Sequence, residues 1–269
     1  MTELEPGFTP SGVQYLTAGD VGDGLLVFTH GWRDSAQGWQ WVIRELASSG
    51  VAEGWRFVSV QRQEVSREDE DSAGLLEDFA DQVVDVIRHF AGPEQRVVIV
   101  GQSMSGAVAE LAAVRLGRPV DALVLVNPAP LGGTPLPDEV LDTFKAAGQV
   151  LDRVDAGLGR LALAVNRDDT ATLRSILSTP AETEKAILQS LASWTGGHPA
   201  GNQPSEVTAP VLIVVTDDAF FSEEMLRAAV APRFGSSHVD EVRGTGHHPH
   251  LERPEELSHV ISEFLSSLG

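Results

Sequence analysis

Short apolar runs alternate with amphipathic stretches along most of the chain. Such alternation is typical of a parallel sheet whose buried strands are covered by helices. The apolar runs predict strands at residues 13–17, 25–29, 56–60, 97–100, 123–126, 210–215 and 239–242. The sequence therefore predicts an α/β fold.

Helical periodicity is clearest between residues 75 and 90. Apolar side chains from Leu75 to Phe90 fall on one helical face, and Gly92 and Pro93 stop the helix. Similar patterns predict helices at residues 40–48, 104–116 and 254–268. The charged run at residues 64–71 has no apolar periodicity, which predicts a solvated loop.

The pattern changes between Pro128 and Ala209. Helix-like segments at residues 137–151, 170–177 and 180–193 follow one another there without a strand candidate of comparable strength. We therefore expect a core made of residues 1–129 and 209–269, interrupted by a helical cap at residues 130–208.

Composition and charge narrow the possible partners. The 269 residues are 42% apolar, which is enough for one large core, and 39 acidic against 19 basic residues give a net charge of −20. This charge repels nucleic acid and opposes adsorption to anionic lipid, and the apolar runs are too short to span a membrane. The start of the chain lacks a signal-peptide pattern, so we expect a cytoplasmic location. Without cysteine, thiol catalysis and thiolate metal sites are excluded.

The segment Gly-Gln-Ser-Met-Ser-Gly, from Gly101 to Gly106, carries the strongest chemical signal. It directly follows one predicted strand and directly precedes a predicted helix. In that context the pattern predicts a nucleophile elbow, in which Ser103 has a strained backbone and its neighbours Gly101 and Ser105 must be small. We interpret Ser103 as a catalytic nucleophile.

A serine nucleophile needs a general base, and a loop near the C-terminus supplies histidines. The loop precedes the last predicted helix, and we interpret its His247 as the base. His248 and His250 are interpreted as loop-packing and capping residues. The three histidines also suggest a metal site, but no cysteine or clear carboxylate set accompanies them and Pro249 disrupts helical ligand spacing. We therefore expect no metal.

Two carboxylates follow the predicted strand at residues 210–215, where open α/β sheets build their sites. Asp218 is favoured as the acid that orients His247, because it begins the loop to two phenylalanines. Asp217 remains the alternative, and the other aspartate is then a solvated turn residue.

An oxyanion in the transition state needs preorganised backbone donors. The first expected donor is the N–H of Met104, the residue after Ser103. The second is the N–H of Trp32 in the segment His30-Gly31-Trp32, where Gly31 allows a close approach at the end of an early strand.

The His-Gly-Trp strand end, the elbow at Ser103, the acidic strand end and the Gly-His loop at His247 together resemble the α/β-hydrolase superfamily. The resemblance covers nearly the whole chain outside the cap. It implies the α/β-hydrolase fold, a mostly parallel central sheet with flanking helices and an inserted helical cap. It also implies a triad of Ser103, Asp218 and His247 under that cap, as in carboxylesterases, lactonases, C–C bond hydrolases and the so-called cofactor-free haloperoxidases. Serine at the elbow argues against dehalogenase or epoxide-hydrolase chemistry.

The chain departs from the family pattern at two places. After the predicted strand at residues 56–60 the family commonly has Asp-x-Arg-Gly-x-Gly-x-Ser, whereas this chain has Gln-Arg-Gln-Glu-Val-Ser from Gln61 to Ser66, so that loop is remodelled. The acid turn lacks its usual glycine and is one residue short, which keeps Asp217 in consideration.

The expected reaction is transfer of an acyl group to water, without a cofactor. The expected substrate is a small to medium apolar or aromatic ester, lactone or related carbonyl compound, because segments that can face the pocket carry aromatic residues. The pocket residues we expect, besides Trp32 and Met104, are His30, Gly31, Phe144, Trp194, Phe220 and Phe221.

Two other functions are alternatives to the hydrolase, and the oligomeric state is unknown from the sequence. In a cofactor-free dioxygenase of this fold His247 would deprotonate an aromatic substrate and Ser103 would only hydrogen-bond it. That group carries its acid after the strand preceding the cap, where this chain has Asn127, which disfavours the assignment. A ligand receptor on the same fold is the second alternative, since a fold does not fix a function.

Overall fold

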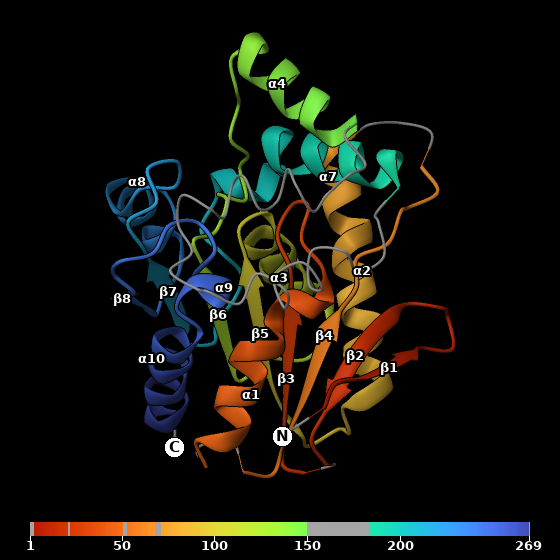
Figure 1. The fold of residues 1–269 in the computed structure, drawn as a ribbon, viewed down its shortest axis with the longest axis vertical. Coiled ribbons are helices and arrows are strands. Elements are labelled where there is room, and N and C mark those ends of the chain that lie inside the picture. The colour runs from red at the N-terminus through yellow and green to blue at the C-terminus, as the bar shows by residue number, and fades with distance from the viewer. Residues whose placement is uncertain (1–2, 21, 51–52, 68–70, 150–182, 269) are drawn as a thin grey trace.

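A sheet of eight strands runs through the middle of the molecule, with helices on both faces (Figure 1). The computed structural model describes residues 3–20, 22–50, 53–67, 71–149 and 183–268. In this part of the chain the strands lie in the order β1-β2-β4-β3-β5-β6-β7-β8. Their bounds are β1 Glu5–Phe8, β2 Gln14–Ala18, β3 Gly24–Thr29, β4 Trp55–Val60, β5 Arg96–Gln102, β6 Ala122–Val126, β7 Val211–Val215 and β8 Ser237–Glu241.

The sheet is parallel from β4 to β8, and only the pairs β1–β2 and β2–β4 are antiparallel. Every residue of β3, β6 and β7 is buried, because helices cover both sides of these strands. Burial on both faces explains why their sequences are continuous apolar runs. The edge strand β8 is largely exposed and polar, which protects the edge from pairing with other chains.

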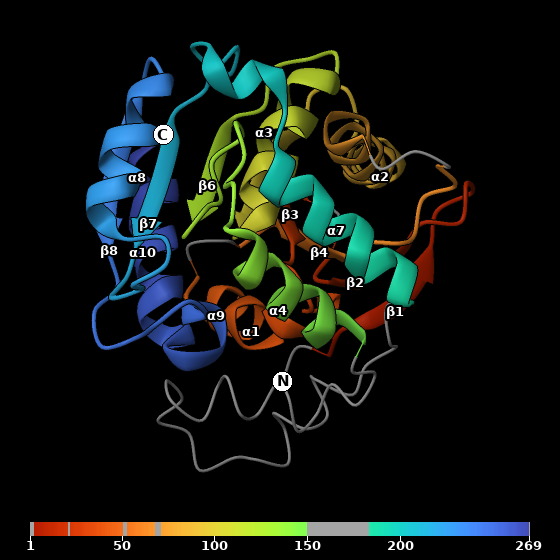
Figure 2. The same cartoon turned by 90° about the horizontal axis from the view of Figure 1, so that it is seen from above.

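The helices of the core form two layers. The helices α2 (Ser72–Phe90) and α3 (Met104–Arg115) cover one face, and α1 (Gln40–Ser48) and α10 (Pro254–Ser267) cover the other (Figure 2). Successive residues of β3 serve different cores, since Leu25 packs with α2 and α3 while Leu26 packs with α1 and α10. The remaining described elements are α4 Asp138–Gln149, α7 Glu184–Gly196, α8 Glu223–Ala229, α9 Pro249–Glu252 and the short 3-10 helices η1 Ala36–Trp39, η2 Pro199–Asn202 and η3 Ala231–Arg233.

The predicted α/β fold and its seven predicted strands are confirmed, each strand within two residues at either end. The four core helices are confirmed too, although α2 begins at Ser72, three residues before the predicted start. The Asp71 side chain accepts a hydrogen bond from the N–H of Gly74 at 3.0 Å and so caps the extra turn. The strand β1 was not predicted, because its sequence Glu-Pro-Gly-Phe has no apolar run.

The helices α4 and α7 lie side by side above the sheet, where the helical cap is expected (Figures 1 and 2). They correspond to the predicted segments 137–151 and 180–193, and α7 starts at Glu184 because the Thr183 side chain caps it. The predicted helix at residues 170–177 lies outside the described residues. A division of the chain at residues 130 and 208 stays a prediction. None of the described helices combines the length and the apolar character needed to cross a membrane.

Candidate active site

Ser103 occupies the sharp turn between β5 and α3, with φ 56° and ψ −128°. Few residues other than glycine adopt such angles, so the turn stores strain. The packing leaves the neighbouring positions no room for a larger residue. A Cβ atom on Gly101 would lie 2.2 Å from the carbonyl oxygen of Ser105, and one on Gly106 would lie 2.4 Å from Cβ of Pro128. The elbow conformation predicted from the sequence is therefore present.

His247 meets this serine from the loop between β8 and α9. Its Nε2 lies 2.9 Å from Oγ of Ser103, and its carbonyl oxygen accepts a hydrogen bond of 2.8 Å from the Gln102 side chain. The buried carboxylate of Glu252 organises the same loop, since it accepts hydrogen bonds from the N–H groups of Gly246 and His248 at 2.7 and 3.1 Å. We did not identify Glu252 from the sequence, where the only signal was an acidic residue close after the histidines.

The structure separates the two candidate aspartates. Oδ2 of Asp218 lies 2.7 Å from Nδ1 of His247, and its Oδ1 accepts a hydrogen bond of 2.9 Å from the N–H of Phe220. Asp217 points elsewhere, because its carboxylate binds Arg243 at 3.2 Å and the N–H of Gly244 at 2.7 Å. The Asp217 side chain is 51% exposed and that of Asp218 is 8% exposed. Asp218 is therefore the aspartate that contacts His247.

The environment of Asp218 keeps it ionised. Burial acts to raise the pKa of its carboxyl group. The hydrogen bond and charge of His247, together with the backbone N–H groups of Phe220 and Phe221, outweigh the burial and hold this pKa below its usual value. An ionised Asp218 fixes the His247 ring with Nδ1 as the donor, so that Nε2 can accept a proton from Ser103.

The loop after β3 closes on the elbow from the other side. A Cβ atom on Gly31 would lie 3.1 Å from Cβ of Ser103 and 2.2 Å from Oε1 of Gln102, so a larger residue here would displace the Gln102 side chain and crowd Ser103. Met104 is the first residue of α3, and the first N–H groups of a helix have no acceptor within it. Both segments expected to supply oxyanion donors thus border Ser103.

A cavity of about 270 Å³ opens over Ser103, Asp218 and His247. Its walls are mainly aromatic, with ring centroids 5.2 Å apart for Trp32 and Phe144 and 5.6 Å apart for Phe144 and Trp194. The lining residues are Trp32, Ser103, Phe144, Trp194, Asp218, Phe220, Phe221, His247, His248 and Glu252. Five aromatic residues from α4, from α7 and from the loops after β3 and β7 therefore surround the serine.

Three residues expected in the pocket are not among those that line it. His30 is completely buried, because its ring turns toward the end of β4, where its Nε2 accepts a hydrogen bond of 3.3 Å from the N–H of Arg62. Gly31 has no side chain to present, and the Met104 side chain is buried in the core beneath α3. The cavity wall is therefore formed without these three residues.

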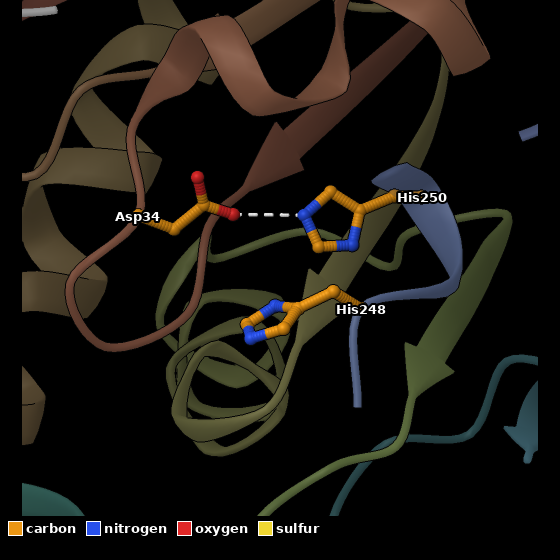
Figure 3. A group of neighbouring side chains, drawn as sticks. All are labelled: Asp34, His248 and His250. Atoms are coloured by element: carbon orange, nitrogen blue, oxygen red, sulfur yellow. Dashed lines mark hydrogen bonds and ion pairs between the residues drawn. The ribbon is translucent and has the colours of Figure 1, made fainter. Parts of the chain in front are cut away.

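A second polar cluster lies next to this cavity and joins Asp34, His248 and His250 (Figure 3). Each of the three offers one ligand atom, and these atoms lie within 4.8 Å of one another, which is a spacing that a metal ion could bridge. No clear carboxylate set accompanies these histidines in the sequence, because Asp34 stands 216 positions before His250. In the structure Oδ2 of Asp34 and Nε2 of His250 form a hydrogen bond of 2.8 Å, and both residues are buried.

The Asp34–His250 pair ties the loop after β3 to the loop that carries His247. Burial acts to raise the pKa of Asp34, but the hydrogen bond and charge of His250 outweigh it and hold the pKa of Asp34 well below its usual range. An ionised Asp34 therefore stabilises the folded state.

Comparisons with known proteins agree with this fold. The model of the family described as "Alpha/beta hydrolase family" matches residues 26–260. A thermophilic esterase from Thermogutta terrifontis is 19% identical, with 99% of each chain covered and a TM-score of 0.73. A bromoperoxidase from Bacillus anthracis is 19% identical, with 97% of this chain and 100% of that chain covered and a TM-score of 0.74. Est816, described as an N-acyl homoserine lactone degrading enzyme, is 20% identical, with 96% and 99% covered and a TM-score of 0.68. A search of curated proteins gives no match.

Replacing Asp34 by asparagine tests the tie between the two loops. Loss of one partner of a buried hydrogen bond costs about 1 to 3 kcal/mol, and more where a charged group takes part, so we expect a loss of about 3 kcal/mol in the free energy of unfolding at pH 7. The folded pKa of Asp34 is lowered, so its contribution is complete above the unfolded pKa of about 3.9 and is lost as the pH falls toward the folded pKa. Urea unfolding should show the difference from wild type at pH 7 and its decline below about pH 4.

Asp217→Asn is the matched control, because Asp217 is half exposed and its ion pair with Arg243 should contribute about 1 kcal/mol or less. Equal losses for the two variants, or a loss for Asp34→Asn that does not change in acid, would contradict a stabilising buried pair.

Proposed function

Because the chain belongs to the alpha/beta hydrolase family, we propose that it is a serine hydrolase that cleaves a small to medium apolar or aromatic ester or lactone through an acyl-enzyme. One observation supports this proposal above all. The side chains of Ser103, His247 and Asp218 form a continuous series of hydrogen bonds, 2.9 and 2.7 Å long, at the floor of an aromatic cavity. A serine activated by an oriented histidine is the arrangement that acyl transfer requires.

The proposed reaction has two steps. In the first, Nε2 of His247 takes the proton of Ser103 while Oγ attacks the substrate carbonyl carbon, and the N–H groups of Met104 and Trp32 hold the oxyanion. His247 then gives its proton to the leaving alkoxide, and the acyl group stays on Ser103. In the second step a water molecule loses a proton to His247 and attacks the acyl ester. The C–O bond to Ser103 then breaks, His247 returns the proton to Oγ of Ser103, and the acid is released. Asp218 stabilises the protonated His247 in both steps.

The shape and chemistry of the cavity support an apolar substrate. Five tryptophan and phenylalanine residues line it, and its polar lining residues are Ser103, Asp218, His247, His248 and Glu252. Esters and lactones present the same carbonyl group to a serine, and proteins described as an esterase and as a lactone-degrading enzyme share this fold. We therefore propose that either kind of bond is cleaved.

The dioxygenase alternative has less support. Its acid is expected after β6, where this chain has Asn127. The amide of Asn127 donates hydrogen bonds to Oγ1 of Thr216 at 2.5 Å and to the carbonyl oxygen of Gly246 at 3.3 Å. It therefore stabilises the backbone just before His247 and does not hydrogen-bond the His247 ring. The acid beside His247 comes from the loop after β7.

Neighbouring aspartates give a matched pair of variants. Asp218→Asn should lower kcat by about 10²- to 10⁴-fold, because the asparagine favours the wrong tautomer of His247. Asp217→Asn should stay within about twofold of wild type, since its carboxylate binds Arg243. Initial rates with p-nitrophenyl esters measure both, and circular dichroism checks folding. Equal losses, or a larger loss for Asp217→Asn, would overturn the role of Asp218.

The pH dependence of kcat/KM should show one acid limb. The lowered pKa of Asp218 keeps that carboxylate ionised throughout the range in which histidine titrates, about pH 5 to 8. Activity should therefore fall toward acid with the slope of a single proton, because a general base that already carries a proton cannot accept that of the serine. A flat profile across this range contradicts His247 as the base.

A further inference from the structure

The remodelled segment after β4 places an arginine inside the protein, next to the loop that follows β3. Arg62 is 5% exposed, and a buried guanidinium group must be satisfied by acceptors. Its Nη1 donates to the carbonyl oxygen of His30 at 2.8 Å, and its Nη2 donates to that of Gly31 at 3.0 Å. Its Nε donates to Oγ of Ser190 on α7 at 3.1 Å. One side chain thus joins the loop after β3 to the cap.

These two carbonyl groups belong to the peptide units that carry the N–H groups of Gly31 and Trp32. In a planar trans peptide the C=O and N–H bonds point in opposite directions, and the described chain has no cis peptide. By holding both oxygens, Arg62 turns both N–H groups away from itself. Gly31 also lies against Ser103. The guanidinium group therefore acts on the direction of the Trp32 N–H together with the His30 ring, whose Nδ1 lies 3.0 Å from the Gly31 carbonyl oxygen, and with the N–H of Asp34, which donates to that oxygen at 3.4 Å.

The charge of Arg62 strengthens this effect. Hydrogen bonds from a cation are stronger than neutral ones, and a polarised peptide donates more strongly through its own N–H. The planar fork of arginine suits two acceptors on adjacent peptides, whereas lysine offers a single ammonium centre.

The helix α7 holds the same loop at a second point. The indole Nε1 of Trp32 donates to the carbonyl oxygen of Ile187 at 3.0 Å. Ser190 donates its own proton to the carbonyl oxygen of Ala186 at 2.8 Å, so its oxygen accepts from Arg62. One turn of α7 thus binds both the guanidinium group of Arg62, through Ser190, and the indole of Trp32, through Ile187.

We propose that Arg62 is a positioning residue that aims the Trp32 N–H at the transition-state oxyanion and couples it to the cap helix α7. This role rests on the proposed serine hydrolase function and adds a residue that touches neither substrate nor Ser103. The segment from Gln61 to Ser66 departs from the family pattern. Its Arg62 side chain nevertheless holds the loop after β3, which carries the Trp32 N–H.

Arg62→Lys and Arg62→Met test this role in the full-length protein. We expect kcat for a p-nitrophenyl ester to fall by about 10- to 100-fold with KM changed by less than about threefold, because the oxyanion forms only in the transition state. An arylboronic acid forms a tetrahedral anion on the serine, so its affinity should fall by the same factor as kcat/KM. The affinity for a carboxylic acid product, which has no tetrahedral centre, should stay unchanged.

Arg233→Lys is the matched control. The Arg233 side chain is also largely shielded, with 11% exposed and its guanidinium group 2.7 Å from Glu110, but it lies outside the cavity above Ser103. This variant should lose stability without changing the ratio of boronate to product affinity. If Arg62→Lys behaves like Arg233→Lys, with lowered stability and an unchanged ratio, then Arg62 serves only the structure and the proposal is wrong.

Two further measurements keep the test decisive. Guanidinium at low, non-denaturing concentration should restore part of the kcat of Arg62→Ala, whereas urea should not. Neither compound should raise the activity of wild type. Ser190→Ala removes only the acceptor on α7 and should lower kcat by a smaller factor, about 3- to 10-fold. Absence of rescue together with full activity in Ser190→Ala would overturn the proposal, even if the Arg62 variants fold poorly.

The outcome for wild type separates this inference from the function on which it rests. A wild-type protein that hydrolyses no ester and binds no boronate would contradict the serine hydrolase itself. An active wild type whose Arg62 variants keep kcat and boronate affinity would contradict only the positioning role.

Discussion

The close packing of α3 against the ends of β5 and β6 is the constraint on which the rest of the site depends. Glycine at positions 101 and 106 lets the helix approach so closely that the chain must turn within a single residue, and Ser103 takes the strained conformation. The turn presents the serine hydroxyl at the carboxyl edge of the sheet. The loops after β3, β7 and β8 end at the same edge, so parallel strand direction brings their side chains to the serine.

Buried polar contacts then fix each loop against its neighbours. Asp218 orients His247, Glu252 holds the backbone around it, and the Asp34–His250 pair joins this loop to the one after β3. Arg62 connects the loop after β3 to α7. Preorganisation of this kind is what electrostatic stabilisation of an oxyanion requires, because the donors need no rearrangement during the reaction.

Local patterns in the sequence predicted most of the sheet and the three residues proposed as the triad. The Ser103 turn and the glycines around it are signals within a few residues, so they can be seen without a structure. Local sequence patterns could not decide between Asp217 and Asp218. The contact of Asp217 with Arg243, which keeps it from His247, forms only in the folded chain. The buried partner of His250 and the role of Arg62 were missed for the same reason, since their contacts join residues far apart in the chain.

Covalent labelling of Ser103 is the most direct test of an activated serine nucleophile. Wild type and Ser103→Ala are incubated with a fluorophosphonate, and their intact masses are recorded over time. We expect a single adduct on wild type and none on the variant, because only an activated serine displaces the fluoride rapidly. Wild type that stays unlabelled, while folded and with its cavity accessible, would contradict the serine hydrolase, as would an adduct that persists in Ser103→Ala.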